Sequence, residues 1–133
     1  MFFEHDINIP KNTSQESYHS ELLRLTRGII KRVDINFPSG CAGLVGVRLF
    51  KDSQQVIPSN YPKWIETDGE TIPILSSIDL SQIPYELEFQ AYNLDDTFNH
   101  TIRVRITMES ITLPFRQQPA ETESQRLIES LSL

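Results

Sequence analysis

Four segments of this 133-residue chain alternate between apolar and polar residues with a period of two. They cover residues 29–37, 44–50, 85–93 and 100–108. Successive side chains of a β-strand point to opposite faces, so this alternation is typical of strands with one buried face. In the first segment it places Ile29, Val33 and Ile35 on one face and Ile30 and Asp34 on the other. The chain is therefore constrained to a β architecture.

Weaker strand patterns and frequent turn signals extend this prediction. Four more candidate strands cover residues 2–9, 22–26, 54–58 and 70–75. Clusters of Pro, Gly, Ser, Asn and Asp separate the candidates, as in PSGCAG and TDGE. Many short strands at close spacing indicate a sandwich or barrel. We predict an all-β fold, an antiparallel β-sandwich of jelly-roll type.

The two flanks of the chain differ from this pattern. Residues 10–20 are polar and without periodicity, and they predict a loop or arm within a β domain at 1–113. Residues 114–133 begin as a Pro-bounded polar linker and end as an amphipathic segment. We predict a short helix there, with Leu127, Ile128 and Leu131 as its apolar side. This helix either packs on its own sandwich or docks on a neighbouring subunit.

Composition excludes several classes of function. A net charge of −6 disfavours a nucleic-acid partner, which requires clustered cations. No apolar run approaches the roughly 18–20 residues of a membrane span. The acidic start MFFEHD predicts that no signal peptide is present. The single cysteine, Cys41, excludes an intrachain disulfide framework.

The densest polar cluster lies between the last two strong strand candidates. One hairpin register would place Glu88 opposite Arg103 and Glu86 opposite Arg105. The sequence therefore predicts a β-hairpin whose solvated four-residue turn runs from 94 to 97.

The alternative for this cluster is an ion site. This interpretation takes Asp95 and Asp96, with His100 or Asn93, as hard ligands for a calcium or magnesium ion, and such ions prefer oxygen ligands. Two adjacent carboxylates point in different directions, however, and rarely complete such a site alone. We therefore expect turn residues and no bound metal.

No motif in the chain points to catalysis. His5, His19 and His100 lie on separate segments, and no zinc-binding or nucleophile motif accompanies them. Cys41 follows a turn, and we expect it to be a buried structural residue. We expect a protein that is not an enzyme and has no catalytic residue and no cofactor.

The loop PSNYPKWIETDGE is the more suggestive segment. Tyr61 and Trp64 lie there beside Asn60, Lys63 and Asp68. Aromatic residues next to amides and carboxylates serve as protein-interface anchors or as sugar-binding platforms, and they also pack loops. We take Tyr61 and Trp64, with the apolar side of the C-terminal segment, as candidate partner-binding residues.

The segments 43–50, 54–72 and 83–93, with a polar arm and a C-terminal helix, resemble small structural proteins of virions and phages. Minor capsid, cement and connector proteins share this architecture, and the resemblance covers roughly residues 22–110. It implies a structural protein that assembles in a host cytoplasm as a homo-oligomer or on the subunits of a shell. A carbohydrate-binding module is the alternative, and an ion-dependent enzyme is a distant third.

Overall fold

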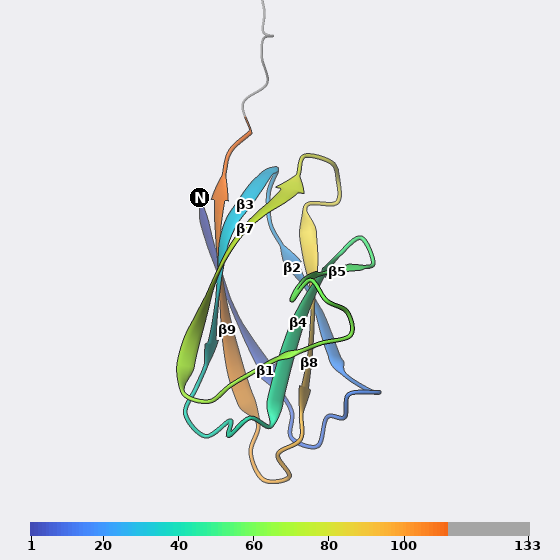
Figure 1. Ribbon diagram of the computed structural model, residues 1–133, viewed down its shortest axis with the longest axis vertical. Coiled ribbons are helices and arrows are strands. Elements are labelled where there is room, and N and C mark those ends of the chain that lie inside the picture. Colours follow the sequence, from blue (N-terminus) through green and yellow to red (C-terminus); the bar gives the residue numbers. More distant parts are fainter. Residues whose placement is uncertain (112–133) are drawn as a thin grey trace, which may run out of the picture.

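The computed structural model describes residues 1–111, in which every regular element is a β-strand (Figure 1). The strands are β1 (Phe2–Ile9), β2 (His19–Arg24), β3 (Gly28–Phe37), β4 (Val45–Lys51), β5 (Gln54–Ile57), β6 (Ile65–Glu66), β7 (Glu70–Leu80), β8 (Glu86–Asn93) and β9 (His100–Glu109). The predicted C-terminal helix, with Leu127, Ile128 and Leu131, lies outside the described residues. Within residues 1–111 there is no helix of the length and hydrophobicity that crossing a membrane requires.

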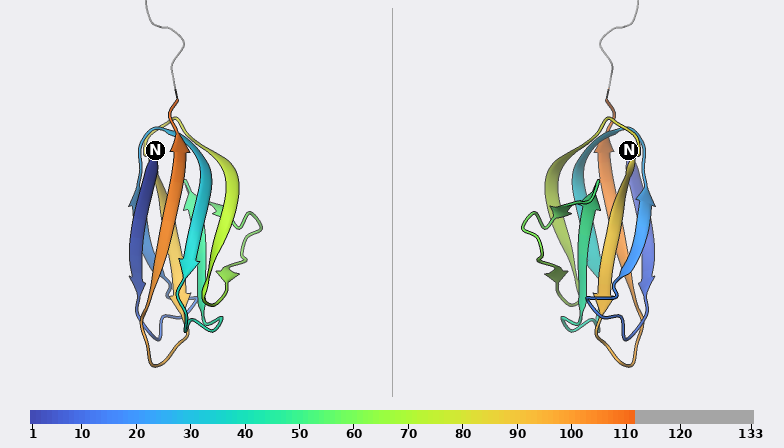
Figure 2. Two further views of the ribbon diagram at one scale, coloured as in Figure 1. Left: turned by 90° about the vertical axis from the view of Figure 1, so that its left-hand side faces the viewer. Right: turned by 90° about the vertical axis from the view of Figure 1, so that its right-hand side faces the viewer.

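The strands form two antiparallel sheets that pack face to face (Figure 2). One sheet has the order β1-β9-β3-β7, and the other has the order β2-β8-β4-β5, with β6 also paired to β4. The first strand therefore pairs with the last, β2 with β8, β3 with β7 and β4 with β5. This is the pairing of a long hairpin rolled into a sandwich, which defines a jelly roll. The predicted fold class is confirmed.

Strand alternation explains most of the core. The residues that face between the sheets include Ile7, Val33, Ile35, Val47, Leu87, Phe89, Ile102, Val104 and Ile106, all of them at most 1% exposed. Ile30 was expected on the polar face of β3, but it is buried. A β-bulge between Ile30 and Arg32 shifts the register by one residue and turns Ile30 inward.

The predicted hairpin between residues 85 and 108 is wrong. β8 and β9 lie in opposite sheets, and the segment between them crosses from one sheet to the other. Arg103 Nε donates to Asp6 Oδ1 at 2.8 Å, and Arg105 Nε donates to Glu4 Oε1 at 3.2 Å. The arginines thus face acidic residues of β1 and do not pair with the glutamates of β8.

The two ends of the sandwich carry different parts of the chain. At one end Met1 and Met108 exchange backbone hydrogen bonds, so the N-terminus lies beside the end of β9 (Figure 1). The β1–β2, β3–β4 and β8–β9 connections gather at the opposite end (Figure 1). There the β1–β2 loop is joined to β8 by two backbone hydrogen bonds between Thr13 and Asn93.

Candidate functional site

A loop between β5 and β6 carries the two aromatic residues that the sequence singled out. Both short strands pair with β4, β6 at Gly46 and Val47 and β5 at its other end. Pro58 and Pro62 lie between them and have no backbone N–H to donate, so the strand cannot continue as one ladder. The intervening residues 58–64 leave the sheet and bring Trp64 against the outer side of β4 and β8.

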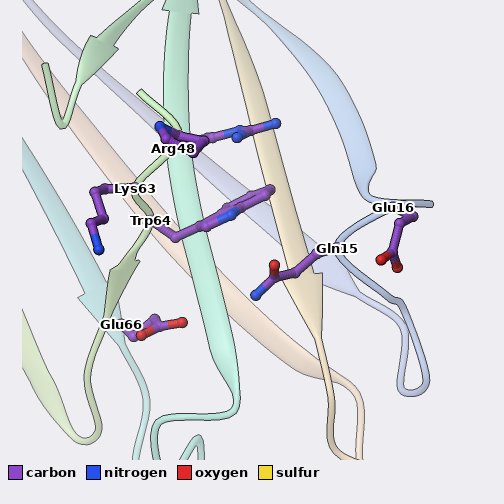
Figure 3. A pocket seen from close by; sticks show the side chains of 7 residues that line it. Gln15, Glu16, Arg48, Lys63, Trp64 and Glu66 are labelled. Carbon is purple, nitrogen blue, oxygen red and sulfur yellow. The ribbon is translucent and has the colours of Figure 1, made fainter. Parts of the chain in front are cut away.

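The centre of this region is Arg48 on β4, which is only 8% exposed. Its guanidinium carbon lies 3.9 Å from the centroid of the Trp64 ring (Figure 3). It also lies 5.1 Å from the ring centroid of Phe50, 5.4 Å from that of Tyr18 and 5.5 Å from that of Tyr61. Four rings within about 6 Å of one cation form a cation–π cluster. We call Arg48 and these four residues the aromatic cluster.

A chain of hydrogen bonds fixes the orientation of Arg48. Its Nε donates to Gln90 Oε1 at 2.8 Å. Gln90 Nε2 in turn donates to Glu88 Oε2 at 2.9 Å, and the Ser20 hydroxyl donates to the same oxygen at 2.7 Å. The amide of Gln90 therefore presents its oxygen to the cation and its N–H to the carboxylate. The network links β2, β8 and β4 across the outer face of their sheet.

The structure brings Tyr61 and Trp64 together but gives them different surroundings. Trp64 is half-buried and meets the buried Tyr92 edge to face, with the ring centroids 4.9 Å apart. Tyr61 is 67% exposed and packs edge to face with Phe50, with the ring centroids 6.4 Å apart. Trp64 thus packs the loop onto its own sheet, whereas Tyr61 offers most of its ring to solvent.

Two hollows flank Arg48. The Lys63 hollow, of about 530 Å³, is lined by Gln15, Glu16, Arg48, Pro62, Lys63, Trp64 and Glu66 (Figure 3). The Tyr61 hollow, of about 560 Å³, is lined by Tyr18, Arg48, Phe50, Ser53, Gln54, Gln55, Ser59, Tyr61 and Gln90. Both volumes fall within the range of small-molecule sites, roughly 300–1,000 Å³. Only the Lys63 hollow has carboxylates in its lining.

Gln55 holds the loop above the Tyr61 hollow. It is buried on β5, and its Nε2 donates to the carbonyl oxygens of Pro58 at 2.6 Å and Lys63 at 2.9 Å. One side chain thus bonds both ends of the segment that carries Tyr61. Both hydrogen bonds are partly buried, and together they favour a single position of the loop over the sheet.

Neither a family model nor a curated protein matches this chain. The site must therefore be interpreted from its own geometry. Sequence reasoning missed Arg48, Tyr18 and Phe50. Strand alternation over residues 44–50 places Arg48 and Phe50 on the face opposite Val45, Val47 and Leu49, and Tyr18 lies in the segment predicted as a polar loop or arm. One feature of the sequence could have indicated this cluster. Tyr and Trp residues lie in the segments before and after the strand that carries Arg48.

The cluster around Asp95 and His100 is a structural cap at the loop end of the sandwich. Asp95 Oδ2 lies 2.9 Å from His100 Nε2, and its Oδ1 accepts the backbone N–H of Thr97 at 2.8 Å and of Phe98 at 3.3 Å. The Asp95 side chain is only 12% exposed, so the expectation of a solvated turn residue is wrong for it. No group of three or more His, Cys, Asp or Glu side chains within residues 1–111 could hold a metal ion.

Asp68 and Cys41 belong to the same end and are separate from the aromatic cluster. Asp68 Oδ1 accepts the backbone N–H groups of Gly40 at 2.9 Å and Ala42 at 3.0 Å, which lowers the pKa of Asp68. Cys41 is fully buried, and burial, with the nearby charges of Asp68 and Asp95, raises its pKa to about 11. A thiol with that pKa carries almost no nucleophilic thiolate at neutral pH.

We expect Asp95→Ala to lower the melting temperature at pH 7, whereas Asp96→Ala leaves it nearly unchanged, because Asp96 is exposed. The Thr97 backbone N–H, and next the His100 side chain, hold the pKa of Asp95 below 3.8. A carboxylate with a lowered pKa stabilises the fold above its unfolded pKa and loses this contribution as the pH falls through the folded value. The difference between wild type and Asp95→Ala should therefore shrink below pH 3.8. Thermal scans across this range measure it, and a difference independent of pH would contradict the assignment.

Proposed function

We propose that this chain is a non-enzymatic assembly protein that forms a homo-oligomer, most simply as a structural component of a virion. The carrying observation is an apolar patch at the loop end of the sandwich. Leu44, Leu94 and Phe98 are all exposed there, Phe98 at 64%. Leu94 N donates to Leu44 O at 2.9 Å, which holds the first two residues side by side on adjacent loops. We call these three residues the end patch.

The rest of the end supports a contact role for the patch. The Asp95 cap and the bonds of Asp68 fix the loops that carry it. Grouped apolar side chains on rigid loops favour association, because burying each one removes apolar surface from water at little ordering cost. Jelly rolls commonly serve as capsid subunits and as lectins. The proposed partner of the end patch is another copy of this chain, and the C-terminal residues 116–133 are proposed as a second contact.

Solution mass tests this proposal. The full chain should be larger than 15.3 kDa by light scattering at micromolar concentration. Phe98→Asp should yield a folded monomer, because it places a charge in the contact, and removal of residues 116–133 should also weaken the oligomer without unfolding the sandwich. Ile83→Asp is the matched control, because Ile83 is also an exposed apolar residue, at 79%, but lies outside the patch. A full chain that is monomeric, or an oligomer unchanged by Phe98→Asp, would refute the role of the end patch.

A second candidate function is carbohydrate binding, favoured by the lining of the Tyr61 hollow. Three rings, those of Tyr18, Phe50 and Tyr61, surround a space that also presents amides and hydroxyls. Aromatic rings cover the C–H faces of a sugar, and amide and hydroxyl groups exchange hydrogen bonds with its hydroxyls. This function is compatible with assembly, because the hollow and the end patch involve different loops.

A further inference from the structure

Arg48 is a nearly buried cation without an ionic partner among residues 1–111. It appears in no ion pair there, although seven pairs join an arginine or lysine of the sandwich to an aspartate or glutamate. Of its five N–H donors, only that of Nε has a hydrogen-bond acceptor among these residues, Gln90 Oε1. The charge of Glu88 reaches Arg48 only through the amide of Gln90.

The terminal nitrogens of Arg48 donate no hydrogen bond to residues 1–111, whose one bond from this guanidinium is the Nε bond to Gln90. Stacking on Trp64 at 3.9 Å occupies a face of the guanidinium plane, and the hydrogen-bonding edge of the group lies in that plane. Arg48 lines both hollows. Guanidinium edges match a carboxylate in a two-point hydrogen bond, and such bonds are stronger when water is excluded.

The two hollows differ in their suitability for an anion. The Lys63 hollow contains Glu16 and Glu66, whose charges oppose a second carboxylate. The Tyr61 hollow has no acidic residue in its lining. Glu88 is connected to this lining only through the Gln90 amide, so a negatively charged group on Arg48 meets two lining carboxylates from the Lys63 side and none from the Tyr61 side.

We propose that the Tyr61 hollow binds an acidic sugar residue, with the carboxylate of a uronic-acid-type ring on Arg48 and the ring stacked on Tyr61. This inference rests on the second candidate function and specifies its ligand class. Tyr61 is the exposed platform, and Ser59 and Gln54 supply hydroxyl and amide groups within the lining. The hydroxyl and amide groups are matched to a polyhydroxylated ring, which is why we favour a sugar acid over an acidic peptide side chain.

The net charge of −6 opposes the approach of an acidic glycan at long range. Salt screens this repulsion over about 8 Å at physiological ionic strength, whereas the contact with Arg48 is made within the hollow and is screened less. The affinity should therefore persist, or rise slightly, when salt is increased from low to physiological concentration. A basic surface patch that bound the same ligand non-specifically would lose affinity with salt.

The test is titration of the full chain with glucuronate, glucuronic acid methyl ester and glucose. Calorimetry gives the affinity, and the emission of Trp64, the only tryptophan, reports on the site because it stacks on Arg48. We expect the ester and glucose to bind about 10- to 100-fold more weakly than glucuronate, on the scale of a hydrogen bond to a charged group. Arg48→Gln should reduce glucuronate affinity by a similar factor.

Matched variants separate binding from folding. Arg48→Gln also removes packing against four rings and so changes the fold as well as the ligand contact. Tyr61→Ala provides a second test at an exposed residue of the same hollow and should weaken the affinity for glucuronate at least fivefold. Lys63→Gln removes a positive charge from the other hollow and should change the affinity less than twofold.

The remaining outcomes overturn the inference in distinguishable ways. Equal binding of glucose, ester and glucuronate would reject the acidic ligand and leave carbohydrate binding standing. If none of the three sugars bound, both the inference and the carbohydrate function would be rejected. This holds whether or not a glutamate-rich peptide binds at Arg48. Neither result bears on assembly, which the solution mass measures.

Discussion

Trp64→Ala should lower the free energy of unfolding by about 3 kcal/mol, the lower end of the range for buried tryptophan, because the ring is half-buried. The lost contacts are the edge-to-face pair with Tyr92 and the stack on Arg48 at 3.9 Å. Loss of the ring also exposes the nearly buried guanidinium on the side that it covered. Urea unfolding followed by circular dichroism measures the effect without relying on tryptophan emission.

Tyr61→Ala is the matched control for this prediction. Both residues come from the same loop, but Tyr61 is 67% exposed, so its removal should cost less than about 1 kcal/mol. If Trp64→Ala left stability unchanged and weakened only the oligomer, Trp64 would be an interface anchor, and its packing on Arg48 would contribute little. The pair of variants therefore separates two of the interpretations that the sequence leaves open.

The fold was predictable because its main determinant is local. Alternation places Val33, Ile35, Ile102 and Val104 on inner faces wherever the strands pair, so the two-sheet architecture follows from the pattern of single segments. The exception is Ile30, which a bulge turns inward. A bulge depends on how β3 meets both of its neighbours, and the alternation of one strand contains no sign of it.

Strand pairing was not predictable in the same way. The glutamates of β8 complement Arg103 and Arg105, but so do Glu4 and Asp6, which lie about 100 residues away in the chain. Charge complementarity on outer faces does not distinguish a neighbour in sequence from a distant strand. In a jelly roll, β8 and β9 belong to different sheets, and a local hairpin rule cannot detect the crossing.

The candidate site was predictable only in part for a related reason. Tyr61 and Trp64 were identified because aromatic residues in a polar loop are conspicuous. Arg48 occupies a position that alternation assigns to solvent, yet it is 8% exposed because the β5–β6 loop folds over it. That loop covers part of the outer face of the sheet, which solvent would otherwise reach. The path of the loop depends on the hydrogen bonds that Gln55 donates to two of its backbone carbonyl groups. Such tertiary coverage has no signature in strand periodicity.

Gly46→Ala should lower the free energy of unfolding by about 3 kcal/mol or more, at the upper end of the range for overpacking. A Cβ atom at Gly46 would lie 2.2 Å and 2.4 Å from two carbons of the Tyr92 ring, so the ring would have to move. Tyr92 is 1% exposed and lies edge to face against Trp64, so its displacement would also disturb the stack on Arg48. Urea unfolding gives the loss, and glucuronate affinity should fall with it.

A double-mutant cycle identifies the cause of this loss. In a Tyr92→Ala background the ring is absent, and Gly46→Ala should then be neutral or stabilising by up to about 1 kcal/mol, because alanine suits a strand interior better than glycine. A strong coupling between the two positions would show that Gly46 leaves the space that the Tyr92 ring occupies. The position of that ring in turn supports Trp64 and Arg48. An equal loss in both backgrounds would instead place the constraint in the β4 backbone, and the aromatic cluster would not depend on the glycine.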